Sequence, residues 1–144
     1  MFCLTSNYWT SFSGLGHSEI YCRENGSIWV FTGPIFKKSV SGGPTYTPSG
    51  KIGSNQVWVP QRLYKILFYP TSVGYTAFAF IMRNEKPPTS AEQSFSTYAT
   101  ASLTTIDEIE SKTGLDFFNA LEDSIEEALE SQKATEQQLS VLIN

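Results

Sequence analysis

Hydrophobic and polar positions change their spacing along the chain, from strand-like through about the first hundred residues to helical beyond them. Short apolar runs rich in β-branched and aromatic residues predict strands over residues 2–5, 27–32, 56–59, 64–69, 75–82 and 95–99. Helices are expected near residues 17–24, 104–113 and 120–131. The pattern predicts an α+β fold, in which a mostly antiparallel sheet is flanked by helices.

Three segments carry more specific signals. Residues 27–32 are continuously apolar, β-branched or aromatic, which predicts a strand buried on both faces and ended by Gly33-Pro34. Residues 37–54 are rich in Gly, Pro, Ser and Thr, which favours a long surface loop. Residues 70–74, Pro-Thr-Ser-Val-Gly, predict a five-residue loop that joins two strands into an antiparallel hairpin.

The helical region has start and stop signals of its own. Thr105 and Glu108 have the spacing of a capping box, in which each side chain bonds the other residue's backbone amide, and Gly114 suits a left-handed helix end. The next helix is expected to bury one stripe of apolar residues: Leu121, Ile125, Ala128 and Leu129. We therefore expect one domain over residues 1–131, followed by a helical extension or tail over 132–144.

Charge is distributed unevenly. Residues 1–100 carry eight Lys/Arg against four Asp/Glu, a net +4, and residues 101–144 carry two against ten, a net −8, which together give the chain's −4. A mildly basic body can bind a polyanion whatever the total charge, because phosphate contacts depend on local charge. The alternative reading of the acidic part is a solvated helical face.

Cysteine usage and hydropathy indicate a compartment. Cys3 and Cys22 do not form the framework that staples small secreted domains, so we expect free thiols in a reducing environment. Apolar runs are far shorter than the roughly 20 residues of a membrane span, and no secretory signal is visible. We expect a soluble intracellular protein that does not bind a membrane.

Four blocks of the sequence, at residues 30–36 (V-F-T-G-P-I-F), 57–67, 79–85 and 106–118, follow one another in the order of a known family pattern. They resemble the DNA/RNA non-specific endonucleases of the endonuclease G-like type. V-F-T-G-P-I-F at residues 30–36 resembles the family's V-x-T-G-P-[IV]-F, and residues 57–67 resemble its V-x-V-P-x-x-[FL]-[YF]-K-[VI]-[IL]. Residues 79–85 resemble A-F-[IV]-x-P-N-E, and residues 106–118 resemble V-D-E-I-E-K-x-T-G-L-D-F-F. The resemblance covers the family's C-terminal half and implies a partial ββα-metal nuclease fold.

The same resemblance implies a chemistry whose residues are missing here. Such enzymes hydrolyse phosphodiesters with a divalent cation, held by an Asn and waters, and with a His of a D-R-G-H segment that activates the attacking water. This sequence has no D-R-G-H, and the Asn and Trp positions before the family's Glu hold Ser11 and Leu15. We therefore expect no cofactor, or Mg²⁺ if the protein is active.

Two residues remain as candidates for a rebuilt site. His17, the single histidine, is the candidate catalytic base, and the alternative is a surface or helix-start histidine, because it follows the F-x-L-T strand that the family motif precedes. Glu19 matches the family's metal-site Glu and is the candidate metal ligand. The alternative is a solvated or structural carboxylate paired with Arg23.

Basic residues interleaved with Trp58 form a candidate nucleic-acid contact, since such side chains can hold phosphates and stack bases. The candidates are Lys37, Lys38, Lys51, Arg62 and Lys65. The alternative is ordinary surface lysines on a long loop, with Trp58 in the core.

These observations predict a non-catalytic protein of nuclease fold, acting as a binding or structural subunit of a larger assembly or with a partner that supplies the missing half. The alternatives are a divergent, active Mg²⁺-dependent endonuclease and an inhibitor or regulator of a full-length relative. A protein partner or a homo-oligomer is expected to cover the sheet left exposed, and nucleic acid is a further expected ligand. The family resemblance adds the mitochondrion as one candidate compartment.

Overall fold

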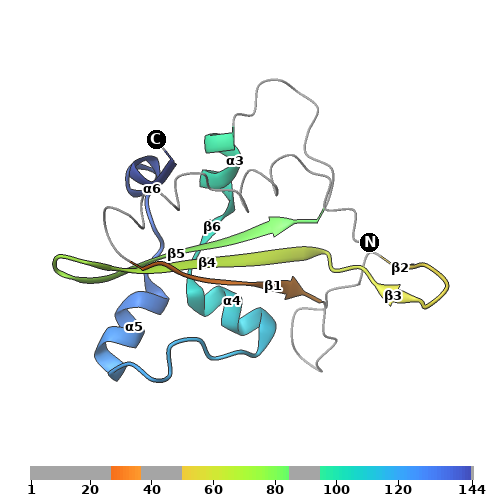
Figure 1. The fold of residues 1–144 in the computed structure, drawn as a ribbon, viewed down its shortest axis with the longest axis horizontal. Coiled ribbons are helices and arrows are strands. Elements are labelled where there is room, and N and C mark those ends of the chain that lie inside the picture. Colours follow the sequence, from red (N-terminus) through yellow and green to blue (C-terminus); the bar gives the residue numbers. More distant parts are fainter. Residues whose placement is uncertain (1–26, 37–49, 85–94, 144) are drawn as a thin grey trace.

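The structure is a computed structural model, and it describes residues 27–36, 50–84 and 95–143 (Figure 1). The strand predicted at 2–5 and the helix predicted at 17–24 lie outside these residues. Across the described ranges, no helix is both long enough and apolar enough to span a membrane.

An antiparallel sheet of four strands forms the centre, in the order β1-β4-β5-β6 (Figure 1). Its strands are β1 (Trp29–Ile35), β4 (Arg62–Thr71), β5 (Gly74–Arg83) and β6 (Leu103–Thr104). A separate pair of strands, β2 (Lys51–Ile52) and β3 (Val57–Trp58), forms a small hairpin. The helices are α3 (Phe95–Ser102), α4 (Ile106–Thr113), α5 (Asp123–Ser131) and α6 (Glu136–Ile143). The predicted α+β class, with a mostly antiparallel sheet flanked by helices, is confirmed.

Helices cover both faces of the sheet, with α3 and α6 on one side and α4 and α5 on the other (Figure 1). Side chains alternate along β4, so that Leu67 and Tyr69 join the core under α3 and α6, whereas Ile66 and Phe68 join the core under α4 and α5. The two central strands are therefore buried on both faces, as their apolar runs require.

Strand β1 is an edge strand among the described residues, and the prediction that it is buried on both faces is wrong. Phe31 and Ile35 pack toward α4 and α5, but Trp29 and Val30 are about half exposed. The prediction that Gly33-Pro34 ends the strand is also wrong, because Pro34 pairs with Leu63. An edge strand tolerates proline, which cannot donate a hydrogen bond to a second neighbour.

Gly33 is required by the close approach of a tyrosine. A Cβ atom at this position would lie 2.7–2.9 Å from the hydroxyl and ring atoms of Tyr64, the residue opposite it on β4. Tyr64 is itself buried and forms part of the core under α4 and α5, so its ring has little room to move. The T-G-P sequence thus places the smallest residue under an aromatic ring.

Replacing Gly33 with Ala should lower the free energy of unfolding by about 1–3 kcal/mol, because the added methyl group overpacks the Tyr64 ring. Urea denaturation followed by circular dichroism measures the change. The same substitution in a Tyr64→Leu background should cost less, since the clashing ring is gone. An equal loss in both backgrounds would show that the clash is not the cause.

The hairpin between β4 and β5 is tighter than predicted. The strands run through Pro70 and Thr71, and the turn contains only Ser72 and Val73, so the predicted five-residue loop is wrong. Gly74 has a φ of 137°, which only glycine adopts readily, and the Thr71 hydroxyl accepts a hydrogen bond from the Val73 amide at 3.3 Å. These two features permit the short turn.

Two further predictions of strands need correction. The edge strand predicted at 95–99 is the first part of helix α3, in which Ala99 is fully buried against the sheet. The strand predicted at 56–59 contains only Val57 and Trp58, and these pair with β2, inside the segment predicted to be a loop. In both places short runs of apolar and small residues lacked a clear period.

Helix α4 begins and ends as predicted, with one difference. The Thr105 hydroxyl accepts a hydrogen bond from the Glu108 amide at 3.1 Å, and Gly114 has a φ of 72°. The Glu108 carboxylate, however, pairs with Lys112 one turn later, so the predicted reciprocal bond to Thr105 is replaced by an ion pair.

Helix α5 is shorter than predicted, and of its expected apolar stripe only Leu129 is buried, while Ile125 and Ala128 are exposed. Helix α6 follows within residues 132–143. Its Leu139 is 1% exposed and lies in the core under α3 and α6.

Candidate nucleic-acid interface

The predicted site residues divide into two groups. His17, Glu19, Lys37 and Lys38 lie outside the described residues, as does Ser11. Lys51, Arg62 and Lys65 lie within them, on β2 and β4.

Lys51 and Trp58 are directly opposite each other on the β2–β3 hairpin. The Lys51 Nζ lies 4.3 Å from the centre of the Trp58 ring, in a cation–π contact, and Trp58 is 50% exposed. The prediction had left open a place for Trp58 in the core. The ring instead lies on the surface beside a positive charge.

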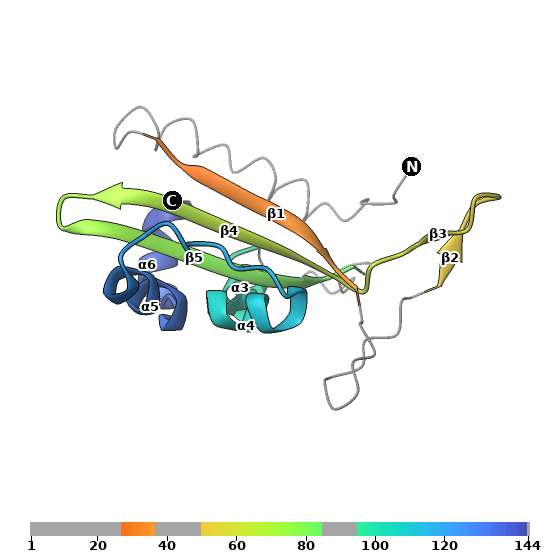
Figure 2. The same ribbon diagram turned by 90° about the horizontal axis from the view of Figure 1, so that it is seen from below.

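The hairpin projects beyond the end of the sheet at which β4 begins and β5 ends (Figures 1 and 2). Its base is held by a hydrogen bond of 2.9 Å from the Val59 amide to the Gly50 carbonyl. Asn84, just after β5, donates its side-chain amide to the Pro60 carbonyl at 2.9 Å and its backbone amide to the Gln61 carbonyl at 2.8 Å. These bonds fix the hairpin to the sheet end.

Two arginines lie at this same sheet end. Arg62 is the first residue of β4 and is paired across the ladder with Arg83, the last residue of β5. Two like charges are thus carried by neighbouring strands at this end of the sheet. Arg83 was not singled out from the sequence, because its proximity to Arg62 depends on the register of the hairpin.

The sequence that contains the hairpin and both arginines is rich in basic residues. Residues 25–84 contain no Asp or Glu and six Lys or Arg, whereas ten of the chain's 14 acids follow residue 100. The acids of α4 and α5 lie below the sheet, and the β2–β3 hairpin lies beyond its end (Figure 1). The β2–β3 hairpin is thus set apart from the acidic helices, whereas alternation along β4 and β5 places Arg62 and Arg83 on the sheet face that carries α4 and α5.

Lys65 belongs to the interior. It is only 7% exposed, and it is flanked across the sheet by Thr32 on β1 and Phe80 on β5. Burial lowers the pKa of the Lys65 ammonium below its usual range. Because its side chain is shielded from solvent, we leave Lys65 out of the interface, and Arg83 takes its place beside Lys51, Trp58 and Arg62.

A hollow of about 340 Å³ lies beside two of the family-like blocks. Its lining is mainly apolar, and the Tyr64 hydroxyl has a pKa raised by burial. The lining residues are Pro34, Ile35, Phe36, Tyr64, Lys112, Thr113 and Leu115. Lys112, its charged member, is paired with Glu108.

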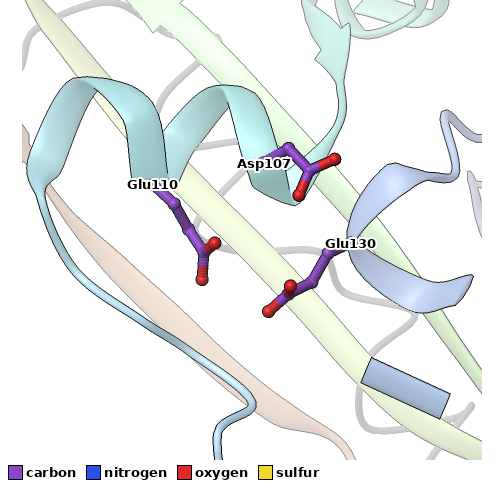
Figure 3. Close-up of side chains that lie close together, drawn as sticks. All are labelled: Asp107, Glu110 and Glu130. Atoms are coloured by element: carbon purple, nitrogen blue, oxygen red, sulfur yellow. The ribbon is translucent and has the colours of Figure 1, made fainter. Parts of the chain in front are cut away.

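An acidic cluster joins α4 to α5 (Figure 3). Carboxylate oxygens of Asp107, Glu110 and Glu130 lie within 4.8 Å of one another, and Asp116 and Glu126 form a second such group with Glu130. Burial, then the negative charges of Glu110, Glu126 and Asp107, and a hydrogen bond to Glu110 raise the pKa of Glu130 to about 7. This cluster was not predicted, because it depends on how α5 packs on α4.

The positions that resemble the family's metal site lie outside the described residues, so the expected poor fit of a metal there stays a prediction from the sequence. At the positions that resemble the metal site, a Ser11 hydroxyl replaces the Asn side-chain oxygen, and Glu19 is the single carboxylate. Mg²⁺ is held by strong oxygen ligands in near-octahedral order, which one carboxylate and a hydroxyl supply poorly. No catalytic step is therefore assigned to a metal.

Comparisons with known proteins agree with this fold. The model of the family described as DNA/RNA non-specific endonuclease matches residues 17–124. Nuclease C1 of Cunninghamella echinulata var. echinulata is 28% identical over 117 residues, which are 81% of this chain and 43% of that protein. A chain in the crystal structure of the EndoG/EndoGI complex, a study of the mechanism of EndoG inhibition, superposes with a TM-score of 0.61 at 20% identity. This match covers 85% of the present chain and 47% of that one.

The present chain thus spans less than half the length of either protein, and it shares a long, continuous block with the family. The family match covers most of its sequence, including all four blocks noted above. The chain belongs to the DNA/RNA non-specific endonuclease family.

Proposed function

We propose that residues 1–144 form the scaffold half of a nuclease fold, which binds nucleic acid but does not cleave it on its own. The catalytic D-R-G-H strand would come from another polypeptide segment. The observation that carries this proposal is that the single histidine, His17, follows the F-x-L-T segment of the sequence and is not part of D-R-G-H. Without a base of pKa near 7, water is a poor nucleophile at neutral pH.

The described residues offer no replacement for the missing base. The raised pKa of Glu130 brings one carboxyl near neutrality, but Glu130 lies in the acidic cluster between α4 and α5. Repulsion between these carboxylates and phosphate disfavours a nucleic-acid substrate there. The basic residues lie instead at the hairpin end of the sheet.

Among the described residues β1 is an edge strand of the sheet, which supports the idea of a completing segment. An edge strand with exposed apolar residues is a template for strand addition by a partner. Trp29 and Val30 provide such residues on β1, and Pro34 limits pairing near its end. We infer that the partner is a strand-bearing segment of a nuclease half and not a membrane.

The test is a plasmid-cleavage assay with the purified chain in Mg²⁺, with His17→Ala and Glu19→Gln as matched variants. We expect no cleavage above the background of His17→Ala at protein concentrations that saturate DNA binding. Cleavage by the unmodified chain that disappears in His17→Ala would overturn the proposal and establish a rebuilt active site.

A further inference from the structure

We propose that the β2–β3 hairpin is a binding site for unpaired nucleic-acid bases, in which the Trp58 indole stacks on a base while Lys51 and the two arginines hold the adjoining phosphates. The inference rests on the proposed function only in taking nucleic acid as the ligand. It adds a specific site and a preference for single strands.

The indole is presented for stacking. Trp58 is 50% exposed on a strand of two residues, so its ring is not part of either core. The Lys51 ammonium at 4.3 Å orients the ring through the cation–π contact. Aromatic side chains beside positive charge are the usual platform for bases of single strands, because every base has a π face.

The arginines are within reach of the same strand of nucleic acid. Trp58 and Arg62 are four residues apart, so their Cα atoms are separated by no more than about 14 Å. The ladder places Arg83 directly opposite Arg62. Asn84 fixes the connection between hairpin and sheet through its two hydrogen bonds to the Pro60 and Gln61 carbonyls, so the backbone segments that carry Trp58 and Arg62 keep a defined relation.

The positive charge at the hairpin end of the sheet favours a polyanion over a protein as the ligand. Ile52 and Val57 on the hairpin are also exposed, and taken without their surroundings they would suit an apolar protein contact. Yet the charged residues that the structure places on the hairpin and at the adjoining strand ends are all basic, namely Lys51, Arg62 and Arg83, which suits a phosphate-binding surface. In a duplex the bases are stacked on one another, so their faces are not available to the indole.

The test measures binding of a fluorescently labelled oligothymidine and of a matched DNA duplex by anisotropy, in EDTA and about 50 mM salt. Trp58→Ala should weaken oligothymidine binding about 5- to 150-fold, the range that corresponds to the loss of one stacked base. Trp58→Phe should restore part of the affinity, because a ring is again present. Duplex binding should change less than threefold in either variant.

Trp29→Ala is the matched control. Trp29 is 47% exposed, nearly as much as Trp58, but it lies on β1 and packs against Phe68 with ring centroids 5.5 Å apart. Its replacement should leave oligothymidine affinity unchanged. Lys51→Gln should weaken oligothymidine binding less than Trp58→Ala does. Because one phosphate contact is lost, it should also reduce the steepness of log affinity against log salt concentration by about 1.

Equal affinity of Trp58→Ala and the unmodified chain for oligothymidine would overturn the proposal, as would an equal loss in Trp29→Ala. A change in oligomeric mass in Trp58→Ala without any change in oligothymidine binding would overturn it in favour of a protein contact. Because binding is measured in EDTA, cleavage in Mg²⁺ would refute the proposed function and leave the stacking site standing.

Discussion

Replacing Leu139 with Ala should lower the free energy of unfolding by about 2–5 kcal/mol, the cost of removing a large side chain from a packed core. Leu139 is 1% exposed and joins Phe78, Phe80 and Ala99 in the core under α3 and α6. The substitution both removes apolar contacts and leaves a cavity between α6 and the sheet. Urea denaturation followed by circular dichroism measures the loss.

The control for Leu139 is Val73→Ala, in the turn between β4 and β5. Val73 is 94% exposed, so its replacement should change the free energy of unfolding by less than about 0.5 kcal/mol. A similarly small effect for Leu139→Ala would show that α6 is not docked and that residues 132–144 are a tail. The large effect would instead establish that this extension is part of the core.

A helix start within residues 132–144 was present in the sequence but was not recognised. Thr135 and Gln138 form a reciprocal capping box: the Thr135 hydroxyl accepts from the Gln138 amide at 3.3 Å, and Gln138 Oε1 accepts from the Thr135 amide at 2.8 Å. The predicted box at Thr105 formed only in part, because Glu108 pairs with Lys112. The sequence spacing therefore predicts where a capping box can form. Whether both of its hydrogen bonds form depends on the other partners available to the two side chains.

The long central strands were predictable because their apolar runs are buried on both sides. Strands β4 and β5 contain the predicted ranges and extend beyond them. The same reasoning failed for β1, since an apolar run does not say whether the strand lies at the centre or the edge of a sheet. Helix α3 was missed because Phe95–Ser102 has no strong apolar stripe and no charged caps.

The candidate interface was predictable in part. Lys51, Trp58 and Arg62 are close in sequence, so composition was enough to group them. Lys65 was grouped with them although it lies three residues after Arg62, and alternation along a strand then places its side chain on the opposite face. Arg83 required the register of β4 with β5, which no local pattern fixes.

Glu130→Gln should raise the free energy of unfolding by about 1–2 kcal/mol at pH 8, after allowance for screening by water. In the folded protein the pKa of Glu130 is raised to about 7 from an ordinary value of 4.5, first by burial and then by Glu110, Glu126 and Asp107. One of its oxygens, Oε1, is shielded from solvent and has no hydrogen-bond partner. Glutamine keeps the size of the side chain and removes the charge.

The dependence on pH follows from the direction of that shift. Between about pH 4.5 and 7 the folded protein holds a proton on Glu130 that the unfolded chain has released, so stability falls as the pH rises through this window. The advantage of Glu130→Gln should therefore disappear near pH 4.5, grow with pH and level off above 7. Glu127→Gln, at an exposed position on the same helix, is the control and should shift stability by less than about 0.5 kcal/mol at either pH. Chemical denaturation at pH 4.5, 6 and 8 measures all three proteins, and a gain for Glu130→Gln that is equal at every pH would rule out ionisation of Glu130 as its cause.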